Sequence, residues 1–171
     1  MNSRNQLTLF VPPSQAVEIE RVRSVVDPIQ FNLIAAHVTL AREDEFDLDG
    51  VEALKARLQA SALGPLVLSF GAPQIFSGHG ILLPCTAGER EFRALRQAVL
   101  GVASVRHQEP HITLAHPRNP RASGNTLAKV TAQAQQLTLS FTSICLIQQQ
   151  DGAPWRVLER FPLSARVTRE D

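Results

Sequence analysis

Residues 37–40 read His37-Val38-Thr39-Leu40, and residues 111–114 repeat them as His111-Ile112-Thr113-Leu114. Successive side chains of a β-strand point to opposite faces, so His and Thr share one face while the apolar residues share the other. Each stretch therefore predicts a strand with an apolar pair in the core and an imidazole beside a hydroxyl on an open face. Two such strands across a cleft would surround one small group.

These side chains suit phosphoryl chemistry at a cyclic phosphodiester. A neutral imidazole can take a proton from water, and a protonated one can give a proton to the departing ribose oxygen. The hydroxyls of Thr39 and Thr113 can donate to the non-bridging oxygens and stabilise the transition state. We therefore predict His37 and His111 as an acid/base pair that needs no metal and no cofactor.

A zinc site is the alternative for part of this stretch. His107, His111 and His116 are spaced at four and five residues, which could mimic a helical ligand set. Pro110 and Pro117 lie within or beside that stretch and favour a strand over a helix. The sequence contains neither a Gly-rich phosphate loop before a helix nor a Gly-x-Ser-x-Gly motif.

Composition sets further bounds. The length of 171 residues predicts a single domain over residues 1–171. The net charge of +1 gives no positive electrostatic field suited to binding a long nucleic-acid duplex. A small anionic ligand or a nucleic-acid end is a better match to this charge than a duplex.

Cys85 and Cys145 lie in apolar runs and are expected to be buried thiols. No signal peptide or 18-residue apolar run is seen, so we expect a cytoplasmic protein without a membrane partner.

The pattern of apolar and turn residues predicts an α+β fold with mainly antiparallel sheets. Helices are expected from Ser14 to Val26, with Asp27-Pro28 as the stop, from Asp49 to Leu63, and at 89–100 and 125–137. Strands are expected at 6–11, 34–41, 66–70, 80–83, 138–148 and 155–163, with Asp151-Gly152 as the last hairpin turn. The order of elements suggests a duplicated half, and hence two pseudo-symmetric lobes with outer helices around a central cleft.

With these motifs the chain resembles the 2H phosphoesterase superfamily, in its 2′-5′ RNA ligase-like and cyclic phosphodiesterase branch, whose signature is two His-x-Thr/Ser-x motifs. The resemblance extends over the stretches 7–13, 76–83, 109–115 and 155–163. It implies a two-lobed fold with one motif in each lobe. It also implies metal-independent opening of 2′,3′-cyclic phosphates on nucleotides or RNA ends to a 2′-phosphomonoester, with possible reversible 2′-5′ ligation and no obligate protein partner.

The resemblance assigns roles to the motif residues. His37 and His111 become the acid/base pair, with His111 as the base and His37 as the acid, and Thr39 and Thr113 bind the phosphate. Because reversal of the reaction exchanges the two roles, the opposite assignment stays open.

Four further residues are candidates for binding substrate. Arg42 and His116 stand where relatives carry a basic or aromatic residue, but strict alternation puts both on the wrong face unless the strands bulge. Phe10 and Phe76, like Trp155, could stack on a base or could pack in the core.

Two other functions remain open from the sequence. The chain could be a module that binds nucleotides or RNA ends, although a pure binder needs no paired acid and base. It could also degrade cyclic oligonucleotides by the same chemistry in a cleft of different shape.

Overall fold

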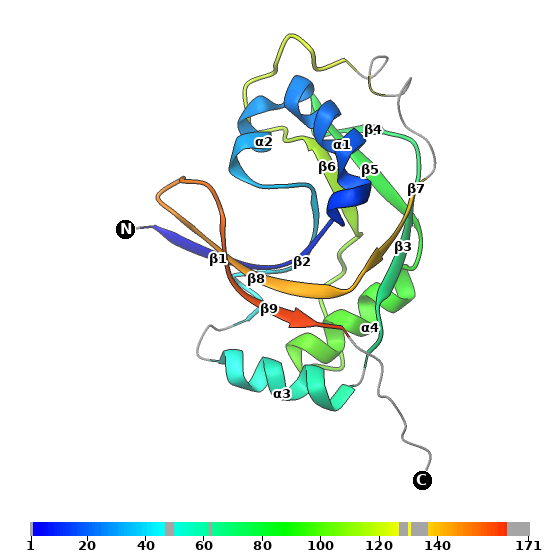
Figure 1. The fold of residues 1–171 in the computed structure, drawn as a ribbon, viewed down its shortest axis with the longest axis vertical. Helices are drawn as coiled ribbons and strands as arrows, with labels where there is room; N and C mark the ends of the chain where they lie inside the picture. Colours follow the sequence, from blue (N-terminus) through cyan, green and yellow to red (C-terminus); the bar gives the residue numbers. More distant parts are fainter. Residues whose placement is uncertain (1, 47–49, 62, 127–129, 131–136, 164–171) are drawn as a thin grey trace.

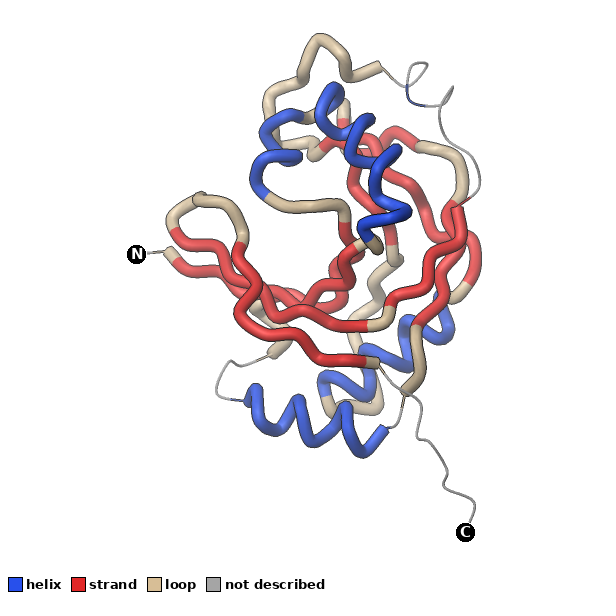
Figure 2. The backbone as a smooth tube through the Cα atoms, in the orientation of Figure 1, coloured by secondary structure: helices blue, strands red, loops and turns tan. Residues whose placement is uncertain are grey.

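The computed structural model describes residues 2–46, 50–61, 63–126, 130 and 137–163. Two antiparallel sheets form the body of the protein, and the helices lie around them (Figures 1 and 2). This arrangement confirms the α+β class. The helices are α1 (Pro13–Val26), α2 (Pro28–Leu33), α3 (Val51–Ser61) and α4 (Glu89–Leu100).

The first sheet has the strand order β2-β1-β8-β9. Its members are β1 (Ser3–Phe10), β2 (His37–Arg42), β8 (Ser143–Gln150) and β9 (Arg156–Pro162). The first motif therefore lies on β2, at one edge of this sheet. The hairpin between β8 and β9 turns at Asp151 and Gly152, both with positive φ, as their turn-forming types predicted.

The second sheet has the order β4-β5-β3-β7, with β6 also paired to β5. Its members are β3 (Leu66–Phe70), β4 (Gln74–Phe76), β5 (Gly80–Ala87), β6 (His111–Ala115) and β7 (Leu137–Phe141). The second motif lies on β6, which like β2 pairs with a single strand of its own sheet among the described residues. Each sheet thus carries one motif on an edge strand.

The apolar residues of both motifs lie in one continuous core. Val38 and Leu40 have no exposed surface, and Ile112 and Leu114 are at most 2% exposed. The helix predicted at 89–100 is α4, and its residues Phe92, Leu95 and Val99 are buried as expected. Figure 1 shows α3 and α4 packed together on one side of the sheets, with α1 and α2 on the other.

Several sequence predictions about the elements were wrong. Helix α1 begins at Pro13, and Ser14 does not cap it, because proline at the first position already has the φ angle that a helix needs. The strand predicted at 138–148 is two strands, β7 and β8, which separate at Thr142 and enter different sheets. The sequence predicted no strand between 66–70 and 80–83, but β4 lies there and forms a hairpin with β5, while β3 and β5 also pair.

Other predictions are only partly tested. Asp49, the expected start of the second helix, lies outside the described residues, and α3 ends at Ser61, before the expected Leu63. Most of the helix predicted at 125–137 also lies outside them, and Leu137 begins β7. Cys145 is buried as expected, whereas Cys85 is partly exposed. Among the described residues, no helix is long and apolar enough to span a membrane.

Candidate active site

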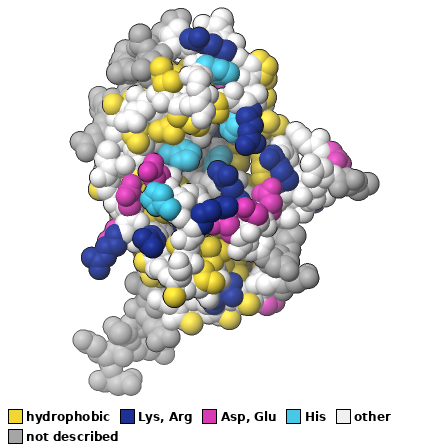
Figure 3. All heavy atoms as spheres, turned by 180° about the vertical axis from the view of Figure 1, so that it is seen from behind, with side chains coloured by type: hydrophobic (Ala, Val, Ile, Leu, Met, Phe, Trp, Pro, Cys, Tyr) yellow, Lys and Arg dark blue, Asp and Glu magenta, His cyan; other side chains and the backbone are white. Residues whose placement is uncertain are grey.

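The two motif strands meet across the boundary between the sheets. Strands β2 and β6 are in contact, although each belongs to a different sheet. The four polar motif residues are only partly buried, in contrast to the apolar residues between them: His37, Thr39, His111 and Thr113. The space-filling view in Figure 3 shows His side chains gathered on one hollowed face, with Arg or Lys side chains beside them.

The two histidines are oriented in the same way. The ring Nδ1 of His37 lies 2.8 Å from the carbonyl oxygen of Ala35, and that of His111 lies 2.9 Å from the carbonyl oxygen of Glu109. A carbonyl oxygen can only accept, so Nδ1 carries the proton and donates in both rings. In each ring Nε2 is therefore the atom that gains or gives a proton.

Each histidine also has a phenylalanine beside it. The rings of Phe10 and His37 have centroids 6.2 Å apart in an edge-on arrangement, and those of Phe76 and His111 are 6.3 Å apart and tilted. The structure thus brings both predicted aromatics to the motifs at matching positions. Trp155 packs with Phe10 against a small buried cluster of Ile34, Cys145 and Ile147, and the Arg4 guanidinium lies 5.3 Å from its ring centroid.

Both motif strands contain an irregularity directly after the threonine. Thr39 pairs with Thr8 and Ala41 with the preceding Leu7, so Leu40 is an extra residue in the ladder between β1 and β2. The two consecutive residues Leu40 and Ala41 are both fully buried, and Arg42 is exposed. Because of this bulge, the side chain of Arg42 returns to the face that carries His37 and Thr39.

The second motif has the same irregularity. Thr113 pairs with Leu82 and Ala115 with Ile81, so Leu114 is the extra residue. Leu114 and Ala115 are both buried, and His116 follows on the histidine face, half-buried. The bulge that the sequence analysis required for Arg42 and His116 is thus present in both strands.

The hydroxyl of Thr39 is fixed by a neighbouring side chain. Gln6 on β1 donates from Nε2 to Thr39 Oγ1 at 3.2 Å and to Thr8 Oγ1 at 2.6 Å. Since Thr39 accepts this hydrogen bond, its own proton remains available for a ligand oxygen. Gln108, just before the second motif, donates to the backbone oxygen of Thr39 at 2.6 Å and so ties the two motifs together.

Two of the candidate site histidines differ from ordinary surface histidines. Burial, with smaller effects of the positive charges of Arg23 and His111, lowers the pKa of His37 to about 4, against the opposing effect of the Ala35 carbonyl. Burial and the nearby Arg118 lower the pKa of His116 as well. His37 is therefore neutral at pH 7 and able to accept a proton.

Several residues around the site carry no signal in the sequence that marks them as part of it. Buried Asp27 accepts from the backbone nitrogen of His116 at 2.8 Å, and Glu45 accepts from that of Arg42 at 3.1 Å. Each carboxylate thus fixes the residue that follows a bulge. The sequence marks Asp27 only as a helix stop, because its partner is distant along the chain.

The three histidines of the zinc alternative have different surroundings. His107 lies 3.6 Å from the carboxylate of Glu109, whereas the Nδ1 of His116 accepts from the backbone nitrogen of Arg118 at 3.2 Å. Within the described ranges, no three His, Cys, Asp or Glu side chains gather in a cluster suited to a metal ion.

Residues 11–153 match the family model of the 2′-5′ RNA ligase superfamily. The chain belongs to this superfamily. The match spans both motifs, all strands of the second sheet and strands β2 and β8 of the first, so the resemblance found in the sequence to the 2H phosphoesterases is confirmed. No match was found among curated proteins.

Several solved structures have a similar fold. TT0787 of Thermus thermophilus is 16% identical, with a TM-score of 0.63 over 95% of this chain and 99% of that one. E. coli LigT complexed with NADP+ is 18% identical, with a TM-score of 0.65 over 95% and 98% of the two chains. LigT complexed with 3′-AMP is 15% identical, with a TM-score of 0.61 over the same shares. At these identities the likeness concerns the fold.

Proposed function

We propose that this protein is a metal-independent phosphodiesterase that opens 2′,3′-cyclic phosphates of nucleotides or RNA ends to a 2′-phosphomonoester. The observation that carries the proposal is the convergence of two edge strands from different sheets, each with one His and one Thr on the same face. Membership of a superfamily of phosphoesterases and ligases supports an enzyme. The ligands of LigT, which include NADP+, ATP and 3′-AMP, support a nucleotide substrate.

In the proposed reaction, His37 is the general base. Its ring is neutral at pH 7 and its free Nε2 accepts the proton of a water whose oxygen attacks phosphorus. The bond from phosphorus to the ribose 3′ oxygen breaks, and His111 gives its proton to that oxygen. This assignment reverses the one carried over from the family, because a base must begin unprotonated.

The remaining candidates contact the phosphate and the nucleoside in this proposal. The hydroxyls of Thr39 and Thr113 donate to the non-bridging oxygens, where negative charge grows in the transition state. Arg42 and His116, which follow the bulges, bind the phosphate or the adjacent ribose. Phe10 and Phe76, whose rings lie beside His37 and His111, would bound the nucleoside on two sides.

The proposed domain organisation is a single unit of two lobes over residues 1–171, each lobe contributing one motif. Reversible 2′-5′ ligation would use the same proton transfers with the 5′-hydroxyl of a second RNA end in place of water, and the reverse of these steps would cleave the 2′-5′ linkage back to the cyclic phosphate.

The deciding experiment is hydrolysis of 2′,3′-cyclic mononucleotides and cyclic-ended RNA in EDTA, with the product regiochemistry read by phosphorus NMR. His37→Ala and His111→Ala should each lower turnover at least about 100-fold, as expected for loss of a general acid or base. His107→Ala is the matched control, since His107 is exposed and paired with Glu109. Unchanged turnover in both motif variants would exclude the mechanism, and tight binding without turnover would favour a binding module.

A further inference from the structure

A buried ion pair lies directly behind the first motif. Arg23 on α1 is 1% exposed, and its Nη1 lies 2.5 Å from Oε2 of Glu20, one turn earlier on the same helix. Burying an arginine is costly unless its charge and its donors are matched. The sequence therefore places Arg23 on the inner face of α1, with Ile19 and Val26, for a reason other than packing alone.

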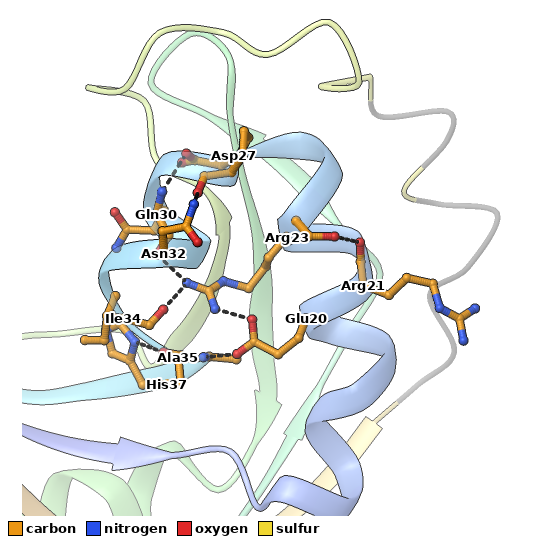
Figure 4. A network of polar contacts seen from close by, with 12 residues as sticks. Glu20, Arg21, Arg23, Asp27, Gln30, Asn32, Ile34, Ala35 and His37 are labelled. Atoms are coloured by element: carbon orange, nitrogen blue, oxygen red, sulfur yellow. Dashed lines mark hydrogen bonds and ion pairs between the residues drawn. The ribbon is translucent and has the colours of Figure 1, made fainter. Parts of the chain in front are cut away.

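The pair holds the backbone that leads into His37. Nη2 of Arg23 donates to the carbonyl oxygen of Ile34 at 2.7 Å and to that of Gln30 at 3.3 Å. The second oxygen of Glu20 accepts from the backbone nitrogen of Ala36. Figure 4 shows the guanidinium between Glu20 and Ile34, with the ring of His37 close by.

These contacts fix the carbonyl that orients the histidine. Ile34 and Ala36 flank Ala35, and both are held by the ion pair. The carbonyl of Ala35 in turn accepts from Nδ1 of His37 at 2.8 Å. Glu20 and Arg23 therefore determine the direction in which Nε2 of His37 points.

The second motif has no matching arrangement in the described residues. Its buried arginine, Arg96 on α4, donates to the side chains of Glu45 and of Gln108, which lies three residues before His111, whereas Arg23 donates to backbone oxygens before His37. The side chains of Glu45 and Gln108 in turn bond to the backbone of β2. The carbonyl of Pro110 is held instead by the backbone nitrogen of Cys85 at 3.1 Å. The two histidines thus have equivalent ring geometry but different supports.

We infer that the Glu20–Arg23 pair is a positioning element that gives the two motif histidines unlike roles, by fixing the backbone that orients the ring of His37. The inference rests on the proposed function in taking His37 as a reacting group. A symmetric pair of motifs would leave two chemically equal histidines, and the cation behind one of them removes that equality.

The charges around His37 agree with this role. Arg23 acts on it from α1 and His111 from β6, while Glu20 is paired with Arg23 and the neighbouring Phe10 on β1 is uncharged. After burial, which has the largest effect, Arg23 and His111 both lower the pKa of His37. Replacing Arg23 by a neutral residue should therefore raise that pKa.

The test compares three variants of the whole chain by NMR titration of the His37 imidazole and by the pH profile of kcat with a 2′,3′-cyclic mononucleotide. The double variant Glu20→Gln with Arg23→Met removes both charges and should raise the titration midpoint of His37, with kcat about tenfold lower from lost alignment. Arg23→Lys keeps the positive charge but loses the planar guanidinium that donates to two carbonyl oxygens. The titration midpoint of His37 should therefore stay unchanged, and kcat should fall. The matched control is Glu18→Gln with Arg21→Met, which neutralises an exposed pair on the same helix and should change neither readout.

An unchanged midpoint and an unchanged kcat in the double variant would overturn the inference. If the double variant does not fold, Arg23→Lys decides: a lower kcat with unchanged KM supports positioning, and wild-type kcat overturns it. If the wild-type protein turns over no cyclic nucleotide, the proposed function fails. The titration of His37 then still reports whether the pair controls its protonation.

Discussion

The carboxylate of Asp27 accepts a hydrogen bond of 2.8 Å from the backbone nitrogen of His116, a residue 89 positions further along the chain. The same carboxylate accepts from Asn119 at 3.0 Å and from the backbone nitrogen of Gln30 at 2.9 Å. Asp27 therefore caps α2 and at the same time holds the segment that follows the second motif. This contact joins the helical layer after β1 to the end of β6.

Loss of the Asp27 carboxylate should destabilise the protein strongly. Asp27→Ala leaves several buried donors without an acceptor, so we expect the free energy of unfolding to fall by about 3 kcal/mol. Urea denaturation measures this loss. Asp44→Ala, which removes an exposed carboxylate paired with Arg106, should leave the unfolding curve nearly unchanged. Similar curves for the two variants would show that Asp27 does not tie the structure together.

The turn into α4 requires glycine at position 88. Gly88 has a φ of +99°, and a Cβ there would lie 2.4 Å from the carbonyl oxygen of Val67. Gly88→Ala should therefore lower the free energy of unfolding by about 3 kcal/mol. At Gly152, φ is also positive but nothing lies within 4 Å, so alanine there should cost only about 1 kcal/mol. Equal losses would show that the contact with Val67 is unimportant.

The sequence predicted elements well where length and boundaries both gave a signal. Helix α4 has three inward apolar residues and glycines at both ends, and its predicted bounds are those of the structure. Helix α2 and strand β4 have only six and three residues, too few to establish a period. The break at Thr142 was invisible because strand-forming residues continue on both sides, and only the packing of the two sheets separates β7 from β8.

The candidate site could be predicted from the sequence as far as its His-x-Thr-Leu motif, which occurs twice. The two motifs identified His37 and His111, and alternation placed their apolar neighbours in the core. The bulges were not predictable, because they arise from pairing with β1 and β5 rather than from the motif itself. Arg23 was detectable in principle, since an arginine in phase with buried Ile19 on α1 indicates a buried charge.

The hydrogen bond from Gln6 to Thr39 should matter for turnover. Gln6→Met keeps the size of the side chain but removes the donor that orients the hydroxyl, so we expect kcat to fall about fivefold. Thr39→Val should lower it further. In the double variant Gln6→Met with Thr39→Val, the two losses of kcat should not add, because Gln6 acts through Thr39. Additive losses in a cyclic nucleotide assay would show that Gln6 acts by another route.

Arg42 should contribute to substrate affinity more than to the chemical step. Its exposed side chain lies on the histidine face after the bulge, so Arg42→Ala should raise KM for a cyclic nucleotide about tenfold with a smaller change in kcat. Arg93→Ala, at an exposed position of α4, is the matched control and should have wild-type kinetics. A variant at Arg42 with wild-type KM would place that side chain outside the substrate site.

The lowered pKa of His37 should make the stability of the fold depend on pH. His37 has a pKa of about 4 when folded, but near its ordinary value of 6.5 when unfolded. Between these values the unfolded chain binds more protons, so the free energy of unfolding should fall as the pH drops from 6.5 to 4. His37→Gln removes this dependence, and the two proteins should diverge by up to roughly 3 kcal/mol across that range. Urea denaturation of both proteins at several pH values measures the divergence.

His116, whose pKa is lowered too, is present in both proteins, so its contribution cancels. Parallel stability curves would mean that His37 protonates as readily in the fold as in the unfolded chain, and its role as the base would then lose its support.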